Sequence, residues 1–229
     1  MVDIGTYVAP SMELIYESGV PDFRGHWDRI LPWVQVVHPQ PGTGDWESPY
    51  LRLAGRRTWP PALGRAEGLD LDPPFAGGGQ LASGVVQDNA AGRLAAMDEA
   101  GVDVQLINAG PSIGAARGLA PNMAAGILGA YNRYAVHYCD ADPTRLKVAL
   151  QLHGLEPQWA AEEIRELSRE PCVAAASVTL PVKIAPESSA FAPIWEALEE
   201  TGLPLVHRAS FSSPVWTPRY LLTYFLHAG

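Results

Sequence analysis

The chain has 229 residues, of which 47% are hydrophobic and 18% charged, and its formal net charge is −9. This composition supplies enough apolar side chains for a hydrophobic core, while the acidic balance argues against nucleic-acid binding, which needs clustered Lys and Arg. No stretch approaches the roughly 18 consecutive apolar residues of a transmembrane helix, and the N-terminus lacks the pattern of a signal peptide. We therefore expect a soluble cytoplasmic protein with no membrane or nucleic-acid partner.

The stretch VDIGTYV, residues 2–8, predicts a short strand at the start of the chain. Residues 9–84 then carry many prolines and glycines, four tryptophans and no long periodic element, although a short helix interrupted by Pro32 fits within residues 23–37. Loops of this length are usually functional or disordered, and the tryptophans argue against disorder. We predict an ordered insertion that covers a binding site; an irregular structural insertion is the alternative.

From residue 85 onward, apolar runs alternate with segments of helical periodicity. The helices have recognisable ends, because Asn89 suits an N-cap, Pro121 suits a first turn and Gly101 suits a C-terminal cap. The expected helices lie at residues 89–101, from 121 onward, 156–170, 191–202 and from 218 onward. The expected strands are the apolar runs at residues 102–108, 146–153, 173–181 and 203–208.

Together with residues 2–8, these runs make five strands separated by helices, which predicts an α/β fold with a parallel sheet buried on both faces. An open five-stranded sheet and part of a (β/α)8 barrel both fit this pattern. A complete barrel takes about 250 residues, and this chain ends in a predicted helix without a sixth strand. We therefore favour a partial (β/α)8 TIM barrel of about five β/α units. It would form one domain over residues 1–229, incomplete at the C-terminus, with the long insertion after strand one.

Binding sites in both architectures form at the carboxyl ends of the strands. The residues at these ends are Gly5, Tyr7, Asn108, His153, Thr179, His207 and Arg208. His207 is the sharpest candidate, because a neutral imidazole is a common metal ligand and general base; a histidine that is only hydrogen-bonded at a strand end fits equally well. For His153, a substrate-facing or structural role is favoured over metal ligation. Cys139 and Cys172 have apolar neighbours and are expected to be buried thiols.

Three longer runs resemble a known family. They are MDEAGVDVQLINAG (97–110), ADPTRLKVALQLH (141–153) and FAPIWEALEETGLPLVHR (191–208). In this order and spacing they resemble the amidohydrolase-related group, in the branch that includes aminocarboxymuconate-semialdehyde decarboxylase and the resorcylate-type decarboxylases. The resemblance covers roughly residues 85–229 and the first strand. It implies a (β/α)8 barrel with an insertion after strand one, a divalent metal that is most often zinc, and cleavage of C–C, C–N or C–O bonds in small, often aromatic carboxylates.

The resemblance also assigns metal ligands, and this chain matches few of them. The family places a D-x-H-x-H or E-x-H pair on strand one, where this sequence has Gly5 and Tyr7. His207 matches the strand-five histidine, and the ligands of strands six and eight would lie beyond Gly229. Glycine offers no ligand, and the tyrosine phenol, with a pKa near 10, is a poor one. A single imidazole cannot build a catalytic zinc site, which takes three protein ligands.

Three hypotheses follow from the resemblance. The chain is part of a metal-dependent hydrolase or carboxy-lyase whose site is completed by further sequence or a second chain, with Tyr7, Asn108, His153 and Arg208 facing the substrate. Alternatively, it is a non-catalytic relative that works as a binding or partner-dependent subunit, as a homodimer or beside an active homologous subunit. The third hypothesis is a fragment without independent function.

Overall fold

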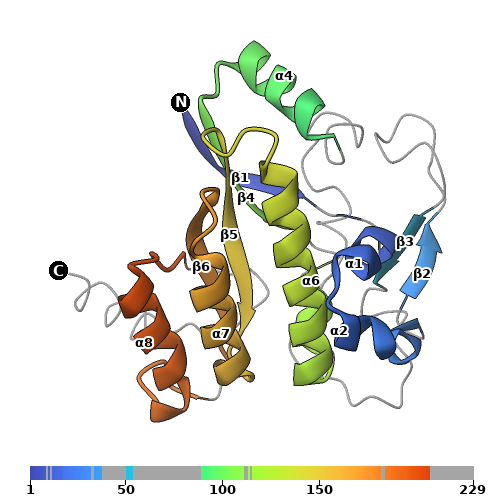
Figure 1. Cartoon of the computed structure of the whole chain (residues 1–229), viewed down its shortest axis with the longest axis vertical. Coiled ribbons are helices and arrows are strands. Elements are labelled where there is room, and N and C mark those ends of the chain that lie inside the picture. The colour runs from blue at the N-terminus through green and yellow to red at the C-terminus, as the bar shows by residue number, and fades with distance from the viewer. Residues whose placement is uncertain are drawn as a thin grey trace.

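The computed structural model describes residues 1–8, 10, 12–31, 34–37, 50–53, 89–110, 113, 115–181 and 184–206. Its main sheet has four parallel strands in the order β1-β4-β5-β6. Their bounds are Val2–Val8 for β1, Val104–Ala109 for β4, Leu146–His153 for β5 and Val173–Thr179 for β6. The sheet is curled and carries helices along one side, which is the architecture of part of a (β/α)8 barrel (Figure 1). The predicted fold class is therefore confirmed.

A further parallel segment lies beside β6. The backbone N–H of Ala176 donates to the carbonyl of Pro204, and the carbonyl of Ala176 accepts from the N–H of Val206. These bonds agree with the last predicted strand as far as Val206. The two site candidates that follow it, His207 and Arg208, lie outside the described residues.

Four helices follow the strands at the predicted places. They are α4 (Ala90–Ala100), α6 (Pro121–Cys139), α7 (Pro157–Leu167) and α8 (Ala192–Thr201), with the 3-10 turns η5 (Ala115–Gly118) and η6 (Ser189–Phe191) before α6 and α8. The Asn89 side chain caps α4 by accepting from two backbone N–H groups of the first turn. Gly101 and Gly202 end α4 and α8 with φ of 66° and 65°, a left-handed conformation that glycine adopts without steric cost.

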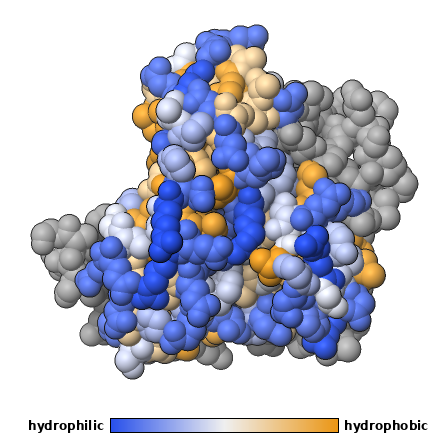
Figure 2. Space-filling model, in the orientation of Figure 1, coloured by the Kyte–Doolittle hydropathy of each residue, from blue (hydrophilic) through white to orange (hydrophobic). Residues whose placement is uncertain are grey.

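The two faces of β5 and β6 differ in chemistry. Leu150, Leu152 and Val178 face the helices and pack with Ile164 of α7 and Ala197 of α8. Burial of each large aliphatic side chain contributes about 1.5–3 kcal/mol, so this face holds α7 and α8 on the sheet. Figure 1 shows α6, α7 and α8 together on this side, and their outer surface over α7 and α8 is mainly hydrophilic (Figure 2). Among the described residues, no helix combines the length and apolarity needed to cross a membrane.

The segment after β1 holds more regular structure than the sequence predicts. Its described parts are α1 (Met12–Ser18), α2 (Pro21–Gly25), η1 (Trp27–Arg29) and the antiparallel strands β2 (Val34–Val37) and β3 (Tyr50–Leu53). The short helix predicted within residues 23–37 is present only as the end of α2 and as η1, because Val34–Val37 forms a strand. Both α1 and α2 are too short to show helical periodicity in the sequence. They are stabilised by packing on α6, where Met12, Ile15 and Phe23 join the core. The predicted cover over a site stays a prediction, because most of residues 38–84 lie outside the described residues.

Cys139 and Cys172 are free and buried, as predicted. They lie at the end of α6 and just before β6, on the helix-facing side of the sheet, and both belong to the core cluster that contains α6. They are therefore part of the packing and not of the strand-end region.

We expect Gly126→Ala to destabilise the fold. A Cβ at Gly126 of α6 would lie 2.6 Å from Cδ2 of Phe23, so α2 would have to shift. Overpacking costs about 1–3 kcal/mol and outweighs the helix propensity that alanine gains, which is at most about 1 kcal/mol. Gly92→Ala in α4 is the matched control, because its Cβ would be 3.7 Å from the nearest atom. Urea denaturation should show a lower midpoint for Gly126→Ala only, and equal midpoints would contradict the packing of α2 on α6.

Candidate functional site

The inner face of the sheet, opposite the helices, carries polar side chains at the carboxyl ends of the strands. In register, Tyr7 of β1 lies beside Asn108 of β4, and His153 of β5 lies beside Thr179 of β6. Partners in register on neighbouring parallel strands project from the same face. The structure therefore places these four predicted strand-end residues on one face of the sheet as two pairs. Ile107 of β4 lies opposite Val148 of β5, so Asn108 is level with Ala149 and the pair of Tyr7 and Asn108 lies before that of His153 and Thr179 along the strands. Their roles in binding stay predictions.

Strands β4 and β5 separate before they reach this edge. They pair only from Gln105 with Leu146 to Ile107 with Val148. Beyond that point the side chain of Asn132 in α6 bonds the backbone of Gln151 twice: Oδ1 accepts from the N–H at 2.7 Å, and Nδ2 donates to the carbonyl at 3.1 Å. A helix side chain thus replaces the missing strand partner, and the backbone groups of Gln151 stay paired beyond the end of the β4–β5 pairing.

Asn108, on the same face of β4, has an unused acceptor. Its side chain is part of a residue that is only 2% exposed. Its Nδ2 donates to the carbonyls of Ile4 and Leu106 at 3.3 and 3.2 Å. Because both partners are acceptors, the amide nitrogen must face them, which fixes the orientation of the amide. The Oδ1 atom is buried and has no partner among the described residues.

Arg117 reaches the same edge from η5, the turn that follows β4. One Nη2–H donates to Oε1 of Gln151 at 2.8 Å. Its Nε is buried and has no partner among the described residues, and none of the described carboxylates forms an ion pair with it. Burial lowers the pKa of Arg117 from its ordinary value, but a guanidinium remains charged at neutral pH. Arg117 was not among the predicted site residues; its position in the connection between a predicted strand and the following helix is the signal that could have found it.

His153 lies beside Arg117 as a neutral imidazole. The residue is 5% exposed, and Nδ1 accepts from the backbone N–H of Leu155 at 3.1 Å. Burial is the largest cause of a lowered pKa; the backbone of Arg117 hydrogen-bonds the ring and opposes this shift, and the guanidinium of Arg117 adds to it. With Nδ1 as an acceptor, the proton of the neutral ring lies on Nε2.

The described residues do not fit a metal centre. Among residues 1–206 as far as they are described, no group of three or more His, Cys, Asp or Glu side chains could hold a metal ion. Strand β1 has Gly5 and Tyr7 at the positions where the resemblance expects histidine ligands. His207 and Arg208, the other predicted site residues, lie outside the described residues.

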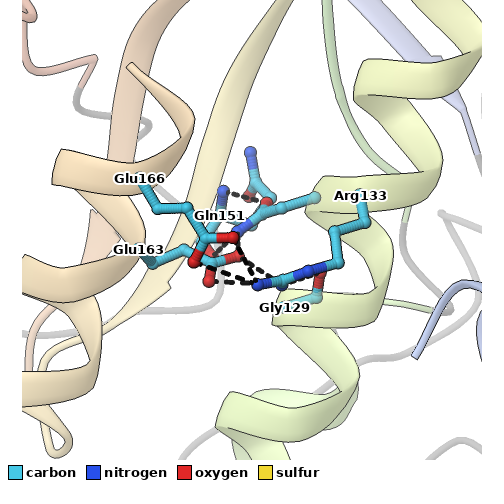
Figure 3. A network of polar contacts seen from close by, with 6 residues as sticks. Gly129, Arg133, Gln151, Glu163 and Glu166 are labelled. Atoms are coloured by element: carbon cyan, nitrogen blue, oxygen red, sulfur yellow. Dashed lines mark hydrogen bonds and ion pairs between the residues drawn. The ribbon is translucent and has the colours of Figure 1, made fainter. Parts of the chain in front are cut away.

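A polar network between α6, α7 and β5, on the helix side of the sheet, supports Gln151 (Figure 3). Asn132 Nδ2 also donates to Glu163 Oε1 at 3.1 Å, and Arg133 Nη1 donates to the same carboxylate at 3.1 Å. Arg133 Nη2 reaches Glu166 at 3.4 Å. Glu163 is 3% exposed, and burial raises its pKa while Arg133 opposes the shift. The network is satisfied within α6, α7 and β5, so we assign it a supporting role.

Comparison with known proteins identifies structures of similar fold. No protein-family model matches the chain, and no curated protein matches it significantly. Solved structures do match it. The chain has part of a (β/α)8 barrel fold. One similar structure is a mutant 5-carboxyvanillate decarboxylase from Novosphingobium aromaticivorans DSM 12444 with bound manganese and 3-methoxy-4-hydroxy-5-nitrobenzoic acid, at a TM-score of 0.58. Another, of 5-carboxyvanillate decarboxylase from the same organism with manganese and 4-hydroxy-3-methoxy-5-nitrobenzoic acid, has a TM-score of 0.53.

Both structures are 17% identical to this chain over 97% of its length, and the chain covers 54% of theirs. This chain therefore spans about half the length of these decarboxylases. At this low identity the structural likeness shows a shared fold alone, and this fold agrees with the curled parallel sheet and its helices.

We expect His153 to make stability depend on pH. Because the folded-state pKa is lowered, the unfolded chain binds the proton more readily. The stability contributed by the neutral ring is complete above the ordinary pKa of 6.5 and is lost as the pH falls below it. His153→Gln should remove this loss, since its amide oxygen can still accept from Leu155. Urea denaturation at about pH 5 and about pH 8 measures this change in the free energy of unfolding. The control is His137→Gln, because His137 is exposed on α6. An unchanged pH dependence in His153→Gln would contradict a buried neutral imidazole.

We also expect Asn132→Ala to be strongly destabilising. The change leaves the N–H and C=O of Gln151 without partners and removes one hydrogen bond to Glu163. Each buried group left unsatisfied costs about 1–3 kcal/mol. Asn122→Ala, at the exposed start of the same helix, should cost less than about 1 kcal/mol. Chemical denaturation of both variants tests this, and similar losses would contradict the strand-replacing role of Asn132.

Proposed function

We propose that this chain forms five β/α units of a barrel of the amidohydrolase-related superfamily and binds a small aromatic carboxylate at the carboxyl ends of its strands. The remaining units of the barrel would come from further sequence or from a second chain, a reading supported by the 54% coverage of the similar decarboxylases. The reaction class we assign to the completed barrel is decarboxylation of an aromatic acid, by analogy with those structures.

The chemistry of the strand-end edge carries this proposal. Tyr7, Asn108, Arg117 and His153 provide a phenol, an amide, a guanidinium and a neutral imidazole along the inner face of the sheet. None of the ion pairs between described residues places a carboxylate on these groups. An edge with donors and a positive charge, and without a described acid, complements an anionic ligand.

A divalent metal does not fit the residues that the structure describes, so no step of a reaction is assigned to one. In the similar decarboxylases manganese is present. In this chain, β1 presents Gly5 and Tyr7, and His207 is the remaining candidate ligand named by the resemblance. The described residues therefore contribute binding and orientation of the ligand.

The residues of β1 favour a second candidate function. Replacement of both strand-one ligands by glycine and tyrosine is the pattern expected of a non-catalytic relative that keeps the binding edge. Such a protein would bind the carboxylate without turnover, as a regulatory or partner-dependent subunit.

The test is a binding and turnover measurement on the chain. We expect isothermal titration calorimetry to show binding of 4-hydroxy-3-methoxybenzoate with a Kd below about 1 mM, equivalent to about −4 kcal/mol. We expect no release of CO2 from 5-carboxyvanillate by the chain alone, with or without added Mn2+, because the described residues hold no metal cluster. Absence of binding would overturn the proposed function. Stoichiometric retention of metal together with turnover would exclude the non-catalytic candidate.

A further inference from the structure

Arg117 differs from the other described guanidinium groups that form hydrogen bonds. Arg133, Arg145 and Arg165 each pair with a carboxylate, at 3.1, 2.7 and 2.6 Å. Arg93 is buried without such a pair, but its three nitrogens donate to the hydroxyl of Tyr138, the side chain of Gln105 and the carbonyl of Tyr7. Arg117 has one described acceptor, the neutral amide of Gln151, and a buried Nε with none.

A buried guanidinium nitrogen without a partner is unfavourable. Burying a charged group costs free energy unless it is paired and hydrogen-bonded. Asparagine and glutamine amides can accept hydrogen bonds but cannot neutralise the charge. The buried Oδ1 of Asn108 is a second polar atom of the inner face without a described partner. Two unsatisfied polar groups on one face of the sheet are what a polar ligand would complete.

The surroundings of Arg117 select the kind of ligand. It extends from η5 to Gln151 on the inner face, and its backbone also bonds the ring of His153. His153 accepts a hydrogen bond at Nδ1 from Leu155 and is therefore neutral, so it adds no second charge. One guanidinium matches one carboxylate in charge, and its N–H fork matches the two oxygens in geometry.

We infer that Arg117 is the anion-binding residue of the strand-end edge and holds the carboxylate of a small ligand, with Gln151 orienting the guanidinium. This inference rests on the proposed function for the identity of the ligand. It adds a named residue, on an element that the resemblance to the amidohydrolase-related group does not assign to any role.

The experiment compares Arg117→Gln with Arg165→Gln in the whole chain. Both variants remove one positive charge, but Arg165 is 40% exposed and pairs with Glu200 on the outer helices. The ligands are 4-hydroxy-3-methoxybenzoate, 2-methoxyphenol, which is the same ring without the carboxylate, and sodium sulfate as an inorganic anion. Calorimetry gives Kd, and thermal denaturation gives the ligand-induced shift in Tm.

We expect the wild type to bind 4-hydroxy-3-methoxybenzoate at least about tenfold more tightly than 2-methoxyphenol, the fold-change of a hydrogen bond to a charged group. Saturation at 100 times Kd should raise Tm by about 5–10 °C. Arg117→Gln should lose the preference for the carboxylate and keep its affinity for 2-methoxyphenol. Arg165→Gln should behave as the wild type.

The other outcomes separate this inference from the proposed function. Retention of the carboxylate preference by Arg117→Gln would overturn the inference and leave the proposed function standing. A wild type that binds neither aromatic ligand, but is stabilised by sulfate only when Arg117 is present, would overturn the carboxylate assignment and the proposed function.

A control for folding completes the design. A large fall in Tm of Arg117→Gln without ligand, not recovered in Arg117→Lys, would show that the guanidinium already has a structural partner and would overturn the inference. If Arg117→Gln fails to fold, Arg117→Lys decides the question, because lysine keeps the charge and loses the planar fork. We then expect Arg117→Lys to bind 4-hydroxy-3-methoxybenzoate more weakly than the wild type does. Its affinity for this carboxylate should still exceed the affinity of the wild type for 2-methoxyphenol.

Discussion

The double hydrogen bond between Asn132 and the backbone of Gln151 is the interaction on which the open edge of the sheet depends. A strand that loses its neighbour exposes N–H and C=O groups, and each one buried without a partner costs about 1–3 kcal/mol. Asn132 supplies one acceptor and one donor at 2.7 and 3.1 Å, so β5 continues to His153 after β4 has diverged. The second N–H of the same amide is taken by Glu163, whose charge is balanced by Arg133. Helices α6 and α7 thereby fix the geometry of an edge that lies on the opposite face of the sheet.

Two buried polar atoms on the inner face lack a described partner, and each lowers the stability of the fold. They are Nε of Arg117, whose Nη2 donates to Gln151, and Oδ1 of Asn108. The neutral imidazole of His153 limits the positive charge to one group. Such unsatisfied polar groups are uncommon in protein interiors and are expected at binding sites, where a ligand supplies the missing partners.

The structure has the fold that the resemblance to metal-dependent enzymes predicts. The described residues lack the metal ligands that the same resemblance predicts. The similar decarboxylases contain manganese and aromatic acids, and they share the fold of this chain at 17% identity. The described residues of the inner face include a cation and several neutral hydrogen-bonding groups. Among the described residues there is no cluster of metal ligands.

Local patterns in the sequence determined the strands, the helix ends and the side chains at the strand ends. Apolar runs, the Asn89 cap and the glycines at 101 and 202 act within a few residues, so each could be read without the fold. The lack of an imidazole at Gly5 and Tyr7 was visible in the same way. Tertiary structure alone decided the rest. Helix α2 packs on α6 where Gly126 leaves room for Phe23, and α1 joins the same core through Met12 and Ile15. Arg117 meets Gln151, 34 positions later, only because a turn returns over the end of β4. Long side chains and short helices are placed by packing between distant segments, and no local pattern encodes that distance.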